Sequence, residues 1–332
     1  MMLKTTIMAA LAAALTQLTP AQQQATTLTT LAQRADVVAH AAVTSSTTPA
    51  PGWRELTLRT VSSLKGAAGS TFTLREPEGR CCGRSLFSLQ PGDERVLFLS
   101  RVGATMHTMG GGRGVLPPTP ALLSHTRALI QAPTTNSLGH LLAQNLDHDE
   151  PRIANDAAMA LATLPSLSLT AAERRAVASS LAAAVQRGST KSAALADVAA
   201  RLGDAQTVDS VLPIYMNARA QDQADLLRNA LARCSPALVA ERMTAHVGAS
   251  AKGDLRAAML LVELPAGVAQ AAMSDLLSRP VHPRTKAQLC EGLLAAGVTR
   301  ASLQPMVPAA VLDVAVKRRA SRPKLRNIRP GR

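Results

Sequence analysis

The hydrophobic periodicity of the chain changes near two adjacent prolines, Pro117 and Pro118. Before them, apolar and polar residues alternate over short segments, which is the pattern of strands with one buried and one exposed face. After them, apolar residues recur every three or four positions, as in amphipathic helices. We therefore expect two different kinds of core in one chain. Because prolines interrupt both helices and strand ladders, a domain boundary is predicted between Gly114 and Leu123.

Short strand segments occupy most of the region before the prolines. The clearest are 37–43, 55–59, 71–75 and 96–99. Turn signals separate them, among them Pro91-Gly92-Asp93 and the glycine-rich run 110–114. Several short strands in fewer than ~100 residues predict a small antiparallel β-barrel over residues 22–118, with the strand period running from Leu28.

Helical segments fill the region after the prolines. Predicted helix starts recur roughly 30 to 40 residues apart, and each alternates with another helix, as in a two-helix repeat. These starts are Pro151, Thr190, Ala220, Lys252 and Pro283. Because each pair buries its apolar stripe only against the next pair, residues 119–316 are expected to form an α-α solenoid of stacked helical pairs. The predicted fold class is thus a multidomain α+β chain.

One series of motifs within residues 27–118 resembles secreted bacterial domains of the OB-like, netrin/TIMP-like barrel type. The series comprises Leu31, Ala35-Asp36-Val37-Val38, Trp53 to Val61, Leu64-Lys65-Gly66, Cys82-Gly83-Arg84 and 91–99. The resemblance implies a barrel. The N-terminal cysteine through which the metalloproteinase inhibitors of that family act is missing, so the resemblance does not imply inhibition.

The segment 141–152, followed by residues 156–161, resembles a HEAT repeat. In that family an acidic residue and a proline form the turn between two helices, and a basic residue that begins the second helix pairs with a carboxylate. The matching positions are Asp149, Pro151, Arg152 and Asp156. Lys252 and Arg284 match the basic position in later repeats, but no regular ladder of Asp and Arg recurs. Residues 134–316 are therefore expected to be HEAT-like.

The N-terminus has the three parts of a secretory signal peptide: Lys4, an apolar run over 5–18, and Thr19-Pro20-Ala21. Removal of residues 1–21 predicts an exported chain, periplasmic or extracellular. The apolar run is shorter than the ~20 residues that cross a bilayer, and no later segment is longer and uncharged, so the mature chain is not expected to span a membrane.

Positive charge is concentrated at the C-terminus of a chain whose formal net charge is +14. The basic residues that follow Asp313 are Lys317, Arg318, Arg319, Arg322, Lys324, Arg326, Arg329 and Arg332. Residues 317–332 are predicted to be a disordered tail. The tail either assists solubility or contacts anionic envelope polymers or lipid headgroups. No nucleic-acid partner is expected, because stacking aromatics do not accompany the basic residues.

The sequence motifs that could indicate catalysis or metal binding are weak. Ser62-Ser63-Leu64-Lys65 matches an S-x-x-K motif, but its companion elements are missing. The neighbours His148-Asp149-Glu150 lie on a predicted turn and point in different directions, which disfavours a metal site. Adjacent Cys81 and Cys82 are either a disulfide or a reactive thiol. Cys234 and Cys290, on helices two repeats apart, are predicted to stay free. No catalytic, cofactor or metal-binding residue is assigned.

The expected function is a non-catalytic exported interaction or scaffold protein that binds partners through the solenoid face and the barrel. One alternative is an inhibitor or ligand-binding barrel with the solenoid as a spacer. Another is an enzyme with dispersed catalytic residues, for which His40, Cys81, Cys82 and a carboxylate would have to meet in one pocket.

Overall fold

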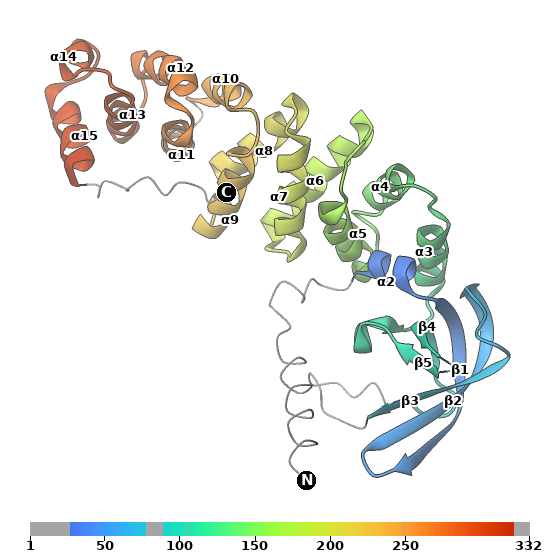
Figure 1. Cartoon of the computed structure of the whole chain (residues 1–332). Coiled ribbons are helices and arrows are strands. Elements are labelled where there is room, and N and C mark those ends of the chain that lie inside the picture. Colours follow the sequence, from blue (N-terminus) through green and yellow to red (C-terminus); the bar gives the residue numbers. More distant parts are fainter. Residues whose placement is uncertain (1–26, 78–88, 104, 249, 322–332) are drawn as a thin grey trace, which may run out of the picture. The chain divides into compact units, whose positions relative to one another are not determined.

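The structure is a computed structural model that describes residues 27–77, 89–103, 105–248 and 250–321 (Figure 1). The chain divides into two compact units, Met1–Thr163 and Leu164–Arg332. The first unit contains a β-barrel and helices α2 to α5, and the second contains helices α6 to α15. The change from strands to helices falls where the sequence predicts, because α3 begins at Pro120. Whether residues 22–118 fold independently stays a prediction.

The strands form one six-stranded sheet, of which β1 to β5 close into a small barrel. They are β1 (Val37–Ala50), β2 (Trp53–Lys65), β3 (Thr71–Pro77), β4 (Glu94–Val102), β5 (Thr105–Thr108) and β6 (Val115–Leu116). They pair in the order β1-β2-β3-β5-β4-β6, and an additional pairing of β1 with β4 closes the barrel (Figure 1). Each predicted strand segment lies within one of β1 to β4. The barrel is mixed rather than wholly antiparallel, because β3 and β5 run parallel.

Alternate residues of the strands fill the barrel, as the period of two requires. The buried cluster includes Val37, Ala39, Ala41 and Val43 of β1, Leu56 and Leu58 of β2, Phe72 and Leu74 of β3, and Leu97 and Leu99 of β4. Strand β4 is apolar on both faces, and Val96 and Phe98 are also fully buried. Helix α2 packs against β4, which explains why this strand has no polar face.

Residues Leu28–Arg34 form helix α2, so the prediction of a strand period from Leu28 was wrong. The Thr27 side chain accepts a hydrogen bond from the Thr30 backbone N–H at 3.0 Å and caps the helix. Leu28, Leu31 and Ala32 have helical spacing, and all three are buried. The helix packs against α3 (Pro120–Gln131) and α5 (Pro151–Thr163). A segment that precedes the barrel in sequence therefore belongs to the helical layer of the first unit.

The glycine-rich run before the prolines forms a short 3₁₀-helix, η2 (Gly111–Gly114), rather than a simple hairpin loop. It leads directly into β6. A Cβ atom at Gly114 would lie 1.9 Å from the backbone oxygen of Met109, so no other residue fits there without a backbone shift.

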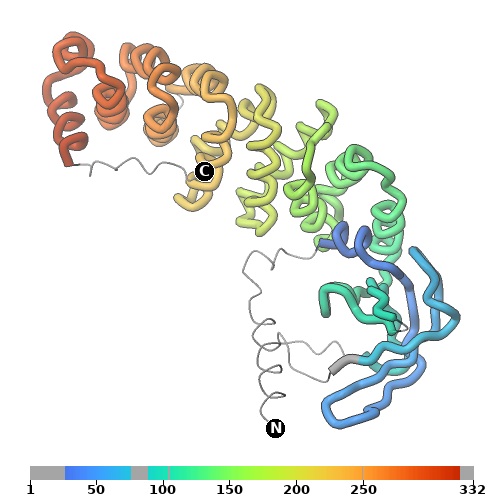
Figure 2. The backbone as a smooth tube through the Cα atoms, in the orientation of Figure 1, coloured from blue at the N-terminus to red at the C-terminus, as the bar shows by residue number. Residues whose placement is uncertain are grey.

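Consecutive helices make up the rest of the chain (Figure 2). After α3 come α4 (Thr135–Gln144) and α5, then α6 (Ala171–Arg187), α7 (Lys191–Leu202), α8 (Ala205–Asn217), α9 (Gln221–Leu231), α10 (Pro236–His246), α11 (Ala251–Glu263), α12 (Ala266–Ser278), α13 (Pro283–Ala295), α14 (Arg300–Leu303) and α15 (Ala309–Ser321). In the second unit α6, α8, α10 and α12 pack in succession, and so do α11, α13 and α15. The predicted starts of α5, α7, α9, α11 and α13 are confirmed, each to within one residue, and so is the solenoid. Cys234 and Cys290 are free, as predicted, and both are buried. Cys290 lies on α13, but the predicted helical position of Cys234 was wrong, because it lies in the turn between α9 and α10.

Long polar side chains connect successive repeats of the second unit by capping carbonyls of the repeat before them. The donors and acceptors are Arg201 to Leu164, Gln223 to Val185, Lys252 and Arg256 to Ala218, Arg279 to Thr244, and Arg319 to Leu294. Carbonyls at a helix C-terminus have no intrahelical partner and carry the negative end of the helix dipole. Cations that reach across from the next repeat satisfy both requirements. Backbone acceptors therefore link the repeats, together with ion pairs between repeats such as Arg174–Asp204, Arg228–Glu263 and Arg242–Asp209.

The prediction of a disordered tail over residues 317–332 was wrong at its start. Helix α15 continues to Ser321, so Lys317, Arg318 and Arg319 are helical. Positive side chains in the last turn are favourable next to the helix dipole, and Arg319 donates to the carbonyl of Leu294. Several predicted features lie outside the described residues: the signal peptide 1–21, Cys81 and Cys82, and Arg322, Lys324, Arg326, Arg329 and Arg332.

Candidate binding site

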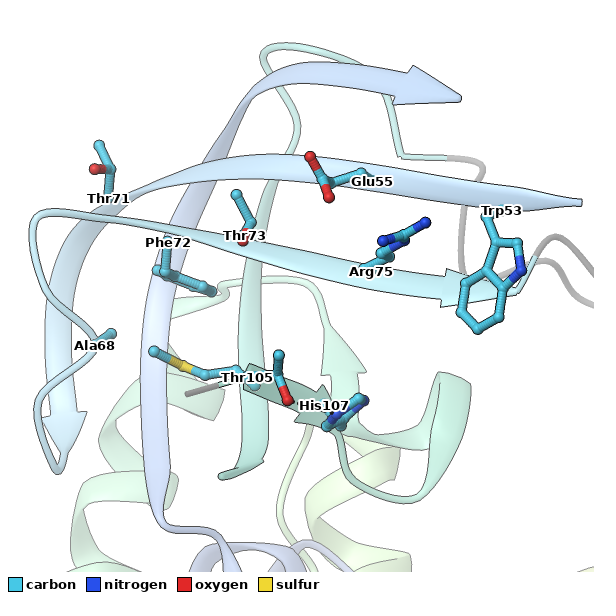
Figure 3. A pocket seen from close by; sticks show the side chains of 10 residues that line it. Trp53, Glu55, Ala68, Thr71, Phe72, Thr73, Arg75, Thr105 and His107 are labelled. Atoms are coloured by element: carbon cyan, nitrogen blue, oxygen red, sulfur yellow. Dashed lines mark hydrogen bonds between the residues drawn. The ribbon is translucent and has the colours of Figure 1, made fainter. Parts of the chain in front are cut away.

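A pocket of about 830 Å³ lies on the outer face of the barrel, across β2, β3 and β5 (Figure 3). Its volume is in the range of small-molecule and peptide sites. The residues that line it are Trp53, Glu55, Ala68, Thr71, Phe72, Thr73, Arg75, Thr105, Met106 and His107.

Strand alternation places polar side chains at this pocket. On β3, Phe72 and Leu74 belong to the barrel core, so Thr71, Thr73 and Arg75 project from the opposite face. Glu55 of β2 is directly opposite Arg75 in the antiparallel register, and its side chain lies on the same face. The sequence pattern predicted this alternation but gave no sign that these side chains meet at a pocket.

The pocket lies where the barrel is most weakly closed. Strands β3 and β5 share a single register pair, Leu74 with Met106. By contrast, β2 pairs with β3 along the whole of β3. Beside the Leu74–Met106 pair, the pocket reaches Phe72 and Ala68, and Met106 itself lines it. Ala68 is only 6% exposed and belongs to the buried core cluster. We call this opening the β3–β5 seam. Its floor is apolar although its rim is polar.

Trp53 is the single tryptophan of the chain, yet it is 41% exposed at the edge of the pocket. The guanidinium carbon of Arg75 lies 5.5 Å from the centre of the Trp53 ring, which is a cation–π geometry. A large aromatic side chain contributes most to stability when it is buried. An exposed one in a chain with so few aromatics is the clearest mark of a binding surface here, and sequence reasoning missed it.

Several polar groups of the rim are available to a ligand. Within the part of the chain that the structure describes, the Glu55 carboxylate and the Arg75 guanidinium form no hydrogen bond or ion pair. The Thr105 hydroxyl donates to the Val102 carbonyl at 2.8 Å and lies 3.1 Å from Nε2 of His107. The rim therefore offers a cation, a carboxylate and hydroxyl groups. The charges of Glu55 and Arg75 cancel, so the rim has little net charge.

Asp156, one of the four residues of the HEAT-like motif, accepts hydrogen bonds from backbone N–H groups at the N-terminus of α2. Its carboxylate is buried and accepts hydrogen bonds from the backbone N–H of Leu28, from the Thr29 N–H at 3.3 Å and from the Thr29 hydroxyl at 3.0 Å. Burial raises the pKa of Asp156, and the bonds from Leu28 and Thr29 and the nearby charge of Arg152 oppose that rise. The carboxylate thus connects two segments far apart in sequence.

Asp149 lies in the turn before α5, and Arg152 is the second residue of that helix. Pro151 is the first residue of that helix, where proline is well tolerated. Nδ1 of His148 accepts a hydrogen bond from the Glu150 N–H at 2.9 Å, so the histidine stabilises the turn that contains Asp149. The Nε atom of Arg152 is buried, and within residues 27–77, 89–103, 105–248 and 250–321 it has no hydrogen-bond partner.

The remaining chemical candidates have structural contacts. Nε2 of His40 lies 2.9 Å from a carboxylate oxygen of Glu94 on β4. Nζ of Lys65, the lysine of the S-x-x-K motif, donates to the carbonyls of Ala32 at 3.0 Å and Gln33 at 2.7 Å. It therefore caps α2 and is not poised to activate a serine. Among the described residues, no three His, Cys, Asp or Glu side chains are grouped as a metal site requires.

The thiols of Cys234 and Cys290 in the second unit are expected to be unreactive. Burial raises the pKa of Cys290 to about 11 and also raises the pKa of Cys234. Both therefore remain protonated at neutral pH, and the protonated thiol is neither the nucleophile nor the metal ligand.

The chain matches no protein-family model, and a search of curated proteins finds no match. None of the described helices combines the length and the apolar character needed to cross a bilayer. The geometry of the site is therefore the basis for a functional assignment.

Proposed function

We propose that this chain is an exported, non-catalytic binding protein whose partner docks on the outer face of the barrel at Trp53. The observation that carries the proposal is the exposure of the single tryptophan, with Arg75 over its ring, at the edge of an open pocket. Aromatic residues and arginine are the residues most enriched among the energetic centres of protein interfaces. The helical repeats supply a second, extended surface for another partner.

The architecture supports the family resemblances on which this proposal draws. A five-stranded closed barrel, with β1 paired to both β2 and β4, agrees with an OB-like domain. OB-type barrels bind their ligands on the face of strands 2 and 3, where Trp53 and Arg75 lie. The two-helix periodicity of the second unit agrees with HEAT-like repeats. A fold alone does not assign a function, so the proposal depends on the site.

Export and a contact with the envelope complete the proposal. The signal-peptide pattern of residues 1–21 supports secretion. Lys317 and Arg318 are exposed at the end of α15, and further basic residues follow in sequence. We propose that they hold the protein near anionic polymers or lipid headgroups through contacts that weaken as the salt concentration rises.

Trp53→Ala and Arg75→Ala are each expected to reduce capture of the partner from the envelope fraction of the source cell by about 10-fold or more. The unfolding midpoint should stay nearly unchanged, because substitutions of exposed residues typically change stability by about 0.5 kcal/mol or less. Quantitative mass spectrometry of the captured proteins, with the mature chain as bait, measures the effect. Arg59→Ala is the control, because Arg59 is an exposed residue of β2, the strand of Trp53, and lies outside the pocket. Equal capture by all variants would reject the barrel face as the docking surface.

A further inference from the structure

We infer that the barrel face binds an extended polypeptide strand of the partner, which adds to the free edge of β3 and inserts an apolar side chain into the β3–β5 seam. This inference rests on the proposed function and specifies its ligand class. Three independent features of the site carry it.

The first feature is the open backbone edge. Strand β3 is paired with β2 along one side, but on the other side Leu74 with Met106 is its only register pair among the residues that the structure describes. An unpaired strand edge is a template for another strand, because its N–H and C=O groups still need partners. Strand addition at such an edge obtains affinity from main-chain hydrogen bonds and therefore suits an extended polypeptide.

The second feature is the apolar floor of the seam. Phe72 and Ala68 are buried core residues, and Met106 packs against the same cluster, yet all three line the pocket. Side chains of an added strand alternate between two faces, so every second residue points toward the barrel. An apolar residue at such a position buries its surface against Phe72 and Met106. Met106 is unbranched and adapts to different shapes.

The third feature is the composition of the rim. Glu55 and Arg75 carry opposite charges, so the rim does not select a polyanion. Thr71, Thr73 and Thr105 offer hydroxyl groups that match the polar atoms of a peptide. Trp53 is a rigid, partly exposed aromatic of the kind that anchors protein interfaces. Together these groups favour a neutral, extended peptide over a nucleic acid or an acidic polysaccharide.

A random nine-residue peptide library, panned against the full mature chain, tests the inference directly. We expect enriched peptides in which apolar and polar residues alternate. Because Trp53 is the only tryptophan, its fluorescence reports binding at the site itself. N-methylation of alternate amides on the edge that faces β3 should weaken binding by about 10-fold or more, since it removes main-chain donors. Methylation of the intervening amides should have little effect.

A substitution in the floor of the seam provides a second test of peptide binding. Ala68→Phe fills the floor of the seam and should abolish peptide binding, whereas Arg59→Ala should leave it unchanged. Because Ala68 is in the core, the variant is interpreted only if its unfolding remains cooperative, and the methylation series on the unmodified chain is decisive in either case. Absence of alternating peptides, or equal binding by both methylated series, would overturn the inference. If envelope capture still depends on Trp53 in that event, the proposed function stands and only the ligand class is wrong.

Discussion

Replacing Arg256 by alanine is expected to lower the free energy of unfolding by about 4 kcal/mol, since a hydrogen bond to a charged group contributes about 1.5–3 kcal/mol and the Arg256 guanidinium contacts three buried carbonyls. Arg256 is only 8% exposed. Its Nη1 lies 3.1, 3.2 and 2.7 Å from the carbonyl oxygens of Tyr215, Met216 and Ala218 at the end of α8. In the alanine variant all three carbonyls lose their charged donor. The Ala218 carbonyl keeps the Lys252 Nζ at 3.1 Å, and the Tyr215 carbonyl keeps the Ala218 N–H at 3.3 Å. Urea unfolding followed by circular dichroism measures the loss.

The contact between α8 and α11 is reciprocal. The Tyr215 hydroxyl donates to the Arg256 carbonyl at 2.9 Å. Burial raises the pKa of Tyr215 to about 12, so the hydroxyl remains a donor at neutral pH. Arg256→Lys keeps the charge but not the planar fork and should lose about half as much stability as the alanine variant. Arg284→Ala, at an exposed position, should change stability by less than about 0.5 kcal/mol. Equal unfolding of the Arg256→Ala and Arg284→Ala variants would contradict the capping role.

Asp156→Ala is the second large perturbation and should cost about 3 kcal/mol, because each buried donor left without an acceptor costs about 1–3 kcal/mol. The donors are the N–H groups of Leu28 and Thr29 and the Thr29 hydroxyl. Hydrogen exchange should show faster opening of α2 in this variant, while the strands far from α2 keep their protection. Unchanged exchange in residues 28–34 would contradict the role assigned to Asp156.

Asp156 also predicts a pH dependence. Burial raises the pKa of its carboxyl above the ordinary 3.8, so the folded chain binds that proton more tightly than the unfolded chain. Its contribution to stability is therefore complete below the ordinary pKa and decreases as the pH rises through the raised value. Asp156→Asn has no proton to release there. The natural chain should lose stability relative to the Asn variant as the pH rises over this interval, and a relative gain would contradict the direction of the shift.

Sequence patterns predicted the fold well where side chains alone determine it. The alternation in 55–59 and 71–75 and the helical stripes that begin at Ile153 and Leu226 follow from the burial of one face, so these strands and helices appear where expected. Helix α2 was missed because a seven-residue helix carries little periodicity. Its stability comes from Asp156, which is distant in sequence and was assigned to a repeat ladder instead.

The hydrogen bonds from side chains of one repeat to backbone carbonyls of the repeat before it were not predictable for a different reason. A search for pairs of Asp and Arg tests side-chain partners only, whereas Arg256, Arg279 and Arg319 donate to backbone carbonyls, which every residue carries. The candidate binding site could not be predicted for a similar reason. Trp53 and Arg75 belong to different strands, and their contact depends on the register of β2 with β3, which the sequence alone did not provide.

Site-specific photocrosslinking in intact source cells tests the central claim most directly, which is that the face around Trp53 contacts a partner. A photoreactive phenylalanine at position 53 should form a crosslinked species of defined mass. The same residue at position 94 should form none, because Glu94 lies on β4, which is separated from β2 by β1 on one side and by β3 and β5 on the other. Crosslinks from position 94 alone, or from both positions equally, would contradict the proposal that the Trp53 face is the docking surface.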